Sequence, residues 1–507
     1  MKEQMRHQWW KRPLAYVMLY AILVFLYIYY DKMEWNANTD IVQFHMILAV
    51  GLSIFGFLAW KIFSKKELDK YDGILVAMVC MGFILRIGYC LYTPWFLRQH
   101  DIATPSLDSN GHAAYIVYLF NGKLPDTNDY QFYHPPFYHI CSAITLHIIG
   151  FFKGESKAEN LIEGSKMVSC FATCVTLIQV KYLFKEIGLK KYALCIAFGI
   201  VALFPYFFIA SGTINNDALS ILFMVIAFRY TLKWYESKSW KDIVVTALAY
   251  GFGMMTKSSC ATMALFTAGV MIYVFVKACK VGTWLLYIKQ YLLFGGIALP
   301  LGMWYAIRNL VKFNQPINYV LELPVENPVW CGDHTSAERF LPDLSLIFNE
   351  PIFCNPCEDY NIYAYSLKTA MMGEYTFVIS THIVSALLLF GGLLAVMSLL
   401  AMICVIIRKT KDFKWISLVS VWVIQMVSFV IFNVQYPFAC TMDYRYIPFT
   451  SLVGAASLGM TVQLMKQRTD SKPTGRLKKV MELCVIGISI LFAIFSISFY
   501  FISKTEA

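Results

Sequence analysis

Acidic and histidine side chains gather in one polar stretch between two apolar segments, residues 93–133. Asp101, Asp108 and His112 all lie in it. A carboxylate at the mouth of a membrane cavity is suited to act as a general base, because it can take a proton from an acceptor hydroxyl or amine. Asp108 and His112 are four residues apart, so a helix through both would bring them onto one face. This stretch is therefore the first candidate for catalysis.

The same spacing permits a structural role for Asp108. The apolar segment Ala113–Phe120 predicts a short helix lying on the membrane surface, and Gly122 is placed to end it. An aspartate just before such a helix is a good N-terminal cap. Catalysis and capping are both open for Asp108 on spacing alone.

The stretch Gln131–His139 reads QFYHPPFYH. Its two prolines favour an extended entry into the apolar helix that follows. Tyr133 and His134 would then be held at the membrane interface, where the headgroup of a lipid lies. The alternative is an aromatic belt with a capping histidine.

Other polar side chains flank apolar segments that end on the same predicted side. Asn216 and Asp217 open one segment and either cap a helix or face the cavity. Arg308 ends another segment, and Arg445 lies just before a third. Arginine suits bidentate recognition of phosphate, so both are candidates for contact with a phosphate-bearing lipid. The alternative is snorkelling at the interface, with Asp443 pairing Arg445.

Three cysteines share a long polar loop. Cys354 and Cys357 form a CxxC motif, and Cys331 lies upstream. A zinc site would need more ligands, and His334 is the one nearby histidine. We expect a disulfide between Cys331 and one of the pair if the compartment is oxidising.

The composition shows which solvent surrounds most of the chain. Of 507 residues, 58% are hydrophobic and 15% charged, and the mean hydropathy is +0.56. Soluble domains average about 25% charged residues, so this is a membrane protein. The net charge of +11 is spread over short loops, which argues against nucleic-acid binding. The nucleotide-binding and hydrolase motifs GxGxxG, P-loop, HExxH and GxSxG are not found, which favours a substrate that arrives already activated in the membrane.

Thirteen apolar segments are long enough for spanning helices. Arg86 lies inside one of them and is either functional or a brace of the bundle. The segments are 14–30, 43–63, 73–92, 166–184, 192–210, 218–233, 243–258, 262–278, 288–307, 378–407, 414–433, 446–465 and 480–502.

Charge decides the sides of the loops and the status of one further apolar segment, 134–152. If the N-terminus lies in the cytoplasm and segment 134–152 is not counted as a span, every basic loop falls on the cytoplasmic side. Counting it as a full span places Lys185, Lys190 and Lys191 outside. We therefore expect 134–152 to be interfacial, re-entrant or partly crossing. The loops expected on the outer side are 93–133, 211–217, 308–375 and 434–445.

Taken together, the outer motifs resemble the GT-C membrane glycosyltransferases of the family 39 type, which includes protein O-mannosyltransferases and the aminoarabinose transferase of lipid A. The resemblance rests on an acidic residue, a histidine or tyrosine four residues on, a short helix, Gly, Leu-Pro and Tyr-x-Pro-Pro-x-Tyr. SGTINNDALS and CTMDYRYIPFT also look like parts of bacterial proteins of this family. The matching residues of the first motif are Asp108, His112, Tyr115, Gly122, Leu124, Pro125, Tyr133, His134, Pro135, Pro136 and Tyr138.

The resemblance implies an all-α polytopic membrane enzyme with about 13 transmembrane helices and surface-lying helices in its outer loops. It covers a catalytic module over residues 73–507, with outer loops 93–133 and 308–375, and residues 1–72 look like a two-span N-terminal addition. The implied reaction transfers a sugar from a polyprenyl phosphate, with inversion. No cofactor and no metal are expected.

Residue roles follow from the same resemblance. Asp108 matches the catalytic carboxylate, and Asp101 is the runner-up. His134 stands where the aminoarabinose transferases have a lysine that contacts the donor phosphate, so Arg445 and Arg308 are expected to share that contact. Ser109 stands where the protein O-mannosyltransferases have a second acid. The remaining expectations are donor contact by Tyr133 and an acceptor cavity lined by His112, Asn216, Asp217 and Tyr444.

The expected partners are a polyprenyl-phosphate-linked sugar, membrane lipids and an acceptor that is a protein, a lipid or a cell-wall polymer. The expected location is a bacterial plasma membrane, with the active site facing outward. The alternative functions are a transporter or flippase for a lipid-linked sugar or polar solute, and a non-catalytic subunit of polymer assembly. Transporters often carry inverted repeats, and this sequence shows no repeat.

Overall fold

The computed structural model describes residues 11–31, 49, 51, 70–353, 355, 359–466 and 474–503. Within these ranges the chain is helical, and no strand forms beyond one bridge between Trp330 and Phe438. The long helices are α2 (Lys11–Asp31), α4 (Lys70–Tyr92), α7 (Lys166–Glu186), α8 (Lys191–Ala202), α10 (Asp217–Ser237), α11 (Trp240–Thr256), α12 (Thr262–Lys280), α13 (Trp284–Phe313), α17 (Thr381–Arg408), α18 (Phe413–Gln435), α19 (Phe449–Lys466) and α20 (Thr474–Ile502). The other α-helices are α5 (His112–Phe120), α6 (Phe137–Lys153), α9 (Pro205–Ile209), α14 (Ser336–Phe340), α15 (Ser345–Phe348) and α16 (Ile362–Met372).

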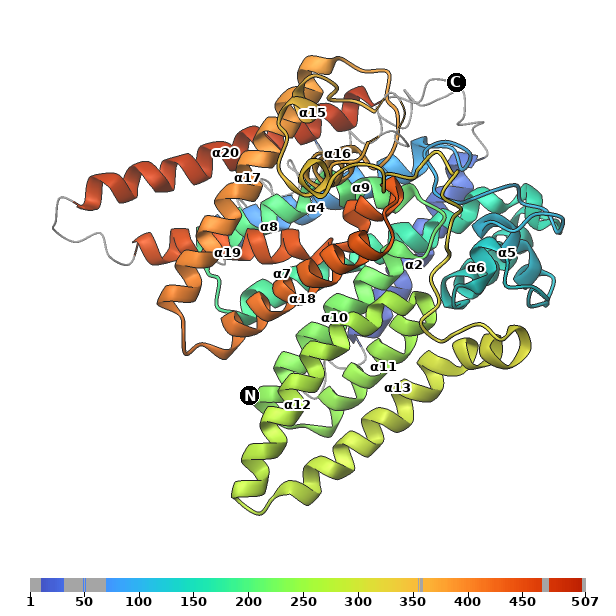
Figure 1. The fold of residues 1–507 in the computed structure, drawn as a ribbon, viewed down its shortest axis with the longest axis horizontal. Coiled ribbons are helices and arrows are strands. Elements are labelled where there is room, and N and C mark those ends of the chain that lie inside the picture. The colour runs from blue at the N-terminus through green and yellow to red at the C-terminus, as the bar shows by residue number, and fades with distance from the viewer. Residues whose placement is uncertain are drawn as a thin grey trace.

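The long helices form the membrane-spanning bundle of Figure 1. Among the described residues, nine helices are long and apolar enough to cross a membrane, or ten if the bent pair α8 and α9 is one span. This confirms an all-α polytopic membrane protein, but it does not reproduce the count of thirteen spans. Apart from residues 49 and 51, the predicted span 43–63 lies outside the described residues, as do Cys354 and Cys357.

Two other predicted spans, 243–258 and 446–465, form helices α11 and α19 that are not among the nine. Helix α11 has only 17 residues. Helix α19 is buried along most of its length and carries small residues such as Gly454, Ala455 and Ser457. Its neighbours α8 and α17 shield it, so a long lipid-facing apolar surface is not required.

The break in the predicted span 192–210 explains the position of Arg86. Helices α8 and α9 are bent by 54°, and Pro205 at the start of α9 cannot continue the hydrogen-bond ladder. The Nη1 atom of Arg86 donates to the carbonyl of Ala202 at 3.0 Å, and Nη2 donates to that of Val201 at 3.5 Å. The arginine therefore satisfies carbonyls freed by the break, which is the bracing role.

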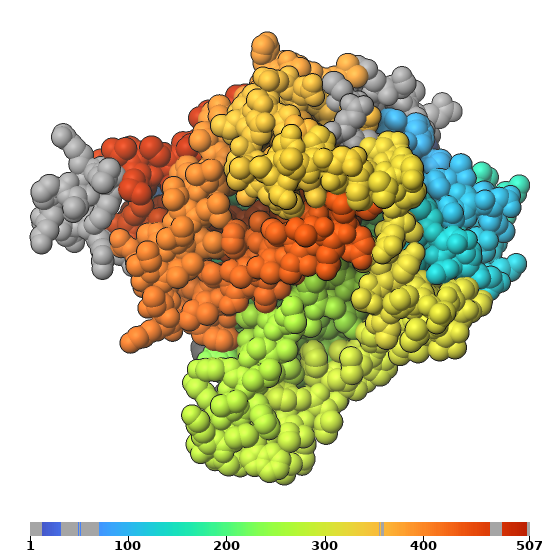
Figure 2. All heavy atoms as spheres, in the orientation of Figure 1, coloured from blue at the N-terminus to red at the C-terminus, as the bar shows by residue number. Residues whose placement is uncertain are grey.

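The four loops predicted to share one side of the membrane contact one another. Gln99 Nε2 donates to the carbonyl of Gly212 at 2.9 Å, and the amide of Cys331 donates to the carbonyl of Pro437 at 2.9 Å. Figure 2 shows the long yellow segment that follows α13 covering this face between the cyan and the orange parts of the chain. These contacts bring the ends of many helices together at one end of the bundle.

Basic loops gather elsewhere, around a cavity of about 590 Å³. Its lysines come from the α7–α8 connection and the start of α8, the α17–α18 connection and the start of α18, and the end of α19. They are Lys190, Lys191, Lys409, Lys414 and Lys466. The sequence-based division into acidic and basic loops therefore corresponds to two separate regions of the fold.

Helices α5 and α6 pack side by side at one edge of the bundle (Figure 1). Helix α6 covers the segment 134–152, whose full crossing the charge pattern disfavours. It has 17 residues, which is about 25 Å at the usual helical rise and shorter than a hydrocarbon core of about 30 Å. Its length thus agrees with an incomplete span.

Candidate active site at the loop end of the bundle

The backbone of the Asp101 segment is held against the start of α5. The amide of His112 donates to the carbonyl of Asp101 at 3.0 Å, and the amide of Ala113 donates to that of Ile102 at 3.1 Å. First-turn amides of a helix have no partner within the helix. Here backbone carbonyls satisfy two of them, and this fixes the loop and the helix to each other.

Gly111 makes this close approach possible. A Cβ atom at position 111 would lie 2.3 Å from the carbonyl oxygen of Ile102 and 2.5 Å from the Cβ of Ala103. The facing loop is itself in an uncommon conformation, because Asp101 and Ala103 have φ values of 51° and 50°. Such outliers occur where the surrounding structure enforces them, often at functional sites.

The structure separates the two candidate bases. The hydroxyl of Tyr130 donates to Oδ1 of Asp101 at 2.6 Å, so this half-buried carboxylate has a fixed direction. Asp108 is exposed. Helix α5 begins at His112 with Gly111 as its N-cap, so Asp108 is neither its cap nor on one helical face with His112. Both of those expectations for Asp108 are wrong, because the backbone of the Asp101 segment already caps the helix.

Three histidines, of which His112 and His139 are buried and His134 is half-buried, lie together at the start of α5. The Nδ1 atom of His112 lies 2.9 Å from Nε2 of His139, and the ring of His112 stacks on that of His134 with centroids 5.9 Å apart. Burial, with the neighbouring His112 and Lys257, lowers the pKa of His134 well below its usual value. Tyr133 packs on His134, with ring centroids 4.1 Å apart.

The pKa of His112 identifies the charged groups that converge on this cluster. Burial lowers this pKa to about 4 as the largest effect, and the charges of Lys257 and Arg445 lower it further. The carboxylates of Asp101 and Asp217 act in the opposite direction. Two acids and two cations from four different segments are therefore close enough to influence one imidazole.

Lys257 enters the site through the break between α11 and α12. Its ammonium group forms an ion pair with Asp217 at the start of α10 and lies 5.2 Å from the centroid of the Tyr446 ring. Asn216 ties the same two elements together, because its Nδ2 atom donates to the carbonyl of Thr256 at 3.1 Å. Neither Asn216 nor Asp217 makes a side-chain cap of α10; both face the junction with Lys257.

Arg445 and Arg308 have different environments. The guanidinium of Arg445 is buried, with Nε 4.0 Å from Oδ2 of Asp443, and makes no hydrogen bond within the described part of the chain. Arg308 instead donates to Asn309 Oδ1 at 2.8 Å and to the carbonyl of Pro125 at 2.6 Å. The guanidinium of Arg445 therefore keeps its donors for a phosphate at the site, whereas two donors of Arg308 hold Asn309 and the loop at Pro125.

Tyr444 lies outside the cluster of charged groups. Its ring packs against Phe204 and Tyr206, and its hydroxyl donates to the carbonyl of Pro448 at 3.3 Å. Its position indicates packing between helices. The structure therefore does not bring it to the cavity with His112 and Asp217.

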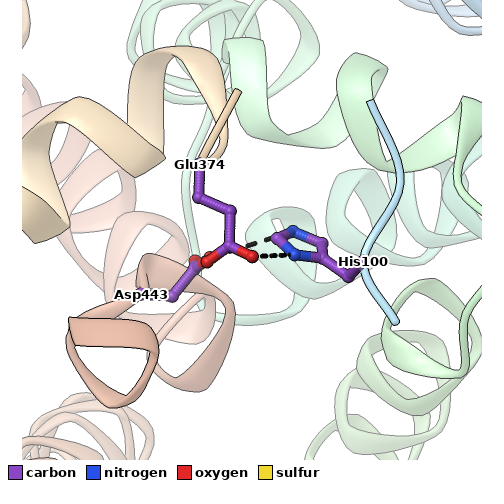
Figure 3. Close-up of side chains that lie close together, drawn as sticks. All are labelled: His100, Glu374 and Asp443. Atoms are coloured by element: carbon purple, nitrogen blue, oxygen red, sulfur yellow. Dashed lines mark ion pairs between the residues drawn. The ribbon is translucent and has the colours of Figure 1, made fainter. Parts of the chain in front are cut away.

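A second cluster adjoins Arg445 and joins three outer loops. His100, Glu374 and Asp443 point toward one another in Figure 3. Nδ1 of His100 forms an ion pair with Glu374, and its Nε2 lies 3.9 Å from Oδ2 of Asp443. The hydroxyl of Tyr365 donates to Oε2 of Glu374 at 3.1 Å.

Burial and mutual charge shift the pKa values of this cluster apart. Burial opposes ionisation of Glu374, but His100 and Arg445 outweigh it and lower its pKa to about 2. Burial lowers the pKa of His100, and the two carboxylates reverse that shift and raise it. Asp443 is dominated by burial and by Glu374, so its pKa rises to about 6 despite Arg445.

Several of these groups were not singled out by the sequence. Lys257 stood out only as a charge between two apolar segments, which is the signal that could have found it. His139 lies within an apolar segment and Glu374 is one of many acidic residues in a long loop, so neither stands out in the sequence as a site residue. Their grouping depends on contacts between distant segments.

Fold and site together define an all-α, multi-pass membrane protein with a buried polar site where its loops meet. Residues 134–305, about a third of the chain, match the family described as dolichyl-phosphate-mannose-protein mannosyltransferase. Over this segment the match confirms the resemblance to the GT-C membrane glycosyltransferases. No curated protein sequence matches the chain.

Two solved structures are similar to this chain at low sequence identity. The oligosaccharyltransferase from Archaeoglobus fulgidus in its apo form has 15% identity and a TM-score of 0.46, over 88% of this chain and 57% of its own. ArnT from Cupriavidus metallidurans in its apo state has 11% identity and a TM-score of 0.49, over 86% of this chain and 76% of its own. The chain thus spans little more than half of the archaeal enzyme, and no residue role is carried over from either structure.

Proposed function

We propose that this protein is a glycosyltransferase that moves a sugar from a polyprenyl-phosphate donor to an acceptor at the outer face of the membrane. An acceptor hydroxyl attacks the anomeric carbon, and its proton passes to an aspartate. The bond between that carbon and the phosphate oxygen breaks, and polyprenyl phosphate leaves with the electron pair. Attack from the face opposite the leaving group inverts the anomeric configuration.

The observation that carries this proposal is the convergence of charges at His112. One acid held by Tyr130 and two half-buried cations from different elements influence the same imidazole. An in-line displacement needs a base on one side of the reacting carbon and cations on the leaving phosphate on the other. The family match over residues 134–305 supports a lipid-linked sugar as the donor.

Within the site, Asp101 is our choice for the base in preference to Asp108. Its carboxylate is oriented by Tyr130, while Asp108 is exposed at the loop tip. Arg445 and Lys257 are assigned to the donor phosphate, since one has uncommitted donors and the other a single carboxylate partner. The lowered pKa of His134 keeps it neutral, so it is assigned a hydrogen bond and not a charge at that phosphate.

The test uses purified protein in lipid vesicles, supplied with a panel of polyprenyl-phosphate sugars and hydroxyl acceptors. Asp101→Asn should lower the transfer rate by roughly 10²–10⁴-fold, the usual contribution of a general base. Asp108→Asn, the matched control from the same loop, should stay within a few-fold of the wild type. Full transfer by a folded Asp101→Asn protein would overturn the assignment of the base.

The same vesicles separate catalysis from transport. Movement of the donor across the bilayer without any glycosylated product, in the wild-type protein and for every sugar tested, would favour the transporter or flippase. Release of polyprenyl phosphate together with a new glycoside of inverted configuration supports the transferase.

A further inference from the structure

We propose that His100, Glu374 and Asp443 form a binding site for a divalent transition-metal cation beside the candidate active site. These residues offer one imidazole nitrogen and two carboxylate oxygens that all lie within 4.8 Å of one another. They come from the first long loop, the segment after α16 and the segment after α18, and their side chains converge in Figure 3. A bound ion would tie these three segments together.

The spacing within the cluster fits an ion better than a direct contact. Nε2 of His100 and Oδ2 of Asp443 are 3.9 Å apart, which is too far for a hydrogen bond. An ion with bonds of about 2.1 Å to each atom fits in that gap. The Nδ1 contact with Glu374 resembles the carboxylate–histidine pairs that orient metal-binding imidazoles, so Glu374 can hold the ring and also offer an oxygen.

A second, independent observation concerns the burial and hydrogen bonding of the Asp443 carboxylate. This side chain is 1% exposed, and its Oδ2 atom has no hydrogen-bond partner in the described part of the chain. Buried carboxylate oxygens are normally paired, and this one faces His100 at 3.9 Å and the Nε atom of Arg445 at 4.0 Å. A cation between the ligands would satisfy that oxygen.

The ligand types narrow the class of ion. Magnesium and calcium prefer oxygen ligands alone, whereas one imidazole with two carboxylates suits manganese, iron or zinc. The proposal concerns binding and does not depend on the transfer reaction. It departs from the expectation that the protein needs no metal.

The experiment measures metal bound by the full-length protein. Purified protein is stripped with a chelator, incubated with Mn²⁺, passed through a desalting column and analysed by elemental mass spectrometry. Mn²⁺ is the sharper probe, because thiols compete for Zn²⁺ more strongly. We expect about one Mn²⁺ per chain, displaced by Zn²⁺ but not by Mg²⁺ or Ca²⁺.

Variants then locate the ion. Glu374→Gln and Asp443→Asn preserve side-chain shape and should each reduce retained Mn²⁺ at least tenfold. His334→Ala is the matched control, because His334 and Glu338 form an exposed histidine–carboxylate pair in the same long loop, 4.0 Å apart. Wild-type protein that retains no more Mn²⁺ than these two ligand variants would overturn the proposal, and so would loss of Mn²⁺ in the folded His334→Ala protein.

Discussion

Replacing Gly111 by alanine should displace the Asp101 loop without changing any polar group of the site. The added Cβ would lie 2.3 Å from the carbonyl oxygen of Ile102, whereas ordinary contacts begin near 3.4 Å, so the two must separate by about 1 Å. That movement weakens the hydrogen bonds from His112 and Ala113 to the loop. Overpacking of this kind costs about 1–3 kcal/mol of stability.

The larger effect should fall on transfer. A displacement of about 1 Å at a catalytic group can lower the rate about 10²-fold. The assay is sugar transfer in lipid vesicles, with thermal unfolding of the same samples. We therefore expect Gly111→Ala to combine a modest loss of stability with a loss of activity close to that of Asp101→Asn.

Two other glycines supply controls. Gly122 has a φ of 70° and Gly296 lies in α13, and nothing is within 4 Å of a Cβ built at either position. Gly122→Ala tests backbone strain alone, and Gly296→Ala tests an added methyl in open space. Both should keep most of the transfer activity. If Gly111→Ala kept the wild-type rate and unfolding temperature, the proposed anchoring of the Asp101 loop would be refuted.

Other substitutions test separate parts of the site. Arg445→Lys should raise the KM for the donor about tenfold or more, because a lysine cannot make a bidentate contact with phosphate. Lys257→Met should lower both stability and donor binding, measured by unfolding and by KM, because it leaves a buried carboxylate unpaired. Arg86→Met should lower the unfolding temperature with little change in KM, since the hydrogen bonds that it removes go to Gly82 within α4 and to the α8 break. His112 has a folded-state pKa of about 4, below its ordinary value, so the unfolded chain takes up a proton first as the pH falls. The free energy of unfolding should therefore fall by about 2 kcal/mol from about pH 7 to about pH 5. His112→Gln should remove that part of the pH dependence in unfolding experiments.

The sequence predicted those features that depend on local chemistry. Residues Ala113–Phe120 were expected to be helical, and α5 covers His112–Phe120 with Gly122 at a φ of 70° just beyond it. An apolar run that ends at a glycine is a local signal for such a helix and does not depend on contacts with distant segments. The match to the family over residues 134–305 likewise confirms a resemblance stated from motifs.

Features that depend on distant segments could not be predicted. The resemblance to the family made Asp108 the leading base, but the start of α5 is capped by the carbonyls of Asp101 and Ile102, which lie outside the motif. From the sequence alone, Arg308 and Arg445 were equal candidates for contact with the donor phosphate. The carbonyl that occupies Arg308 belongs to Pro125, and only the folded chain shows that contact.

The charges around Arg445 link the proposed metal ion to the proposed reaction. Its guanidinium is influenced by Glu374, Asp443 and Asp217, so three carboxylates compete with a phosphate for one cation. A divalent ion bound by Glu374 and Asp443 would balance those two charges and leave Arg445 to the donor. Loss of the ion should therefore raise the KM for the donor more than it lowers kcat, whereas Asp101→Asn should do the reverse. Transfer measured with and without Mn²⁺ distinguishes these outcomes, and an effect of the ion on kcat alone would break the link between the two proposals.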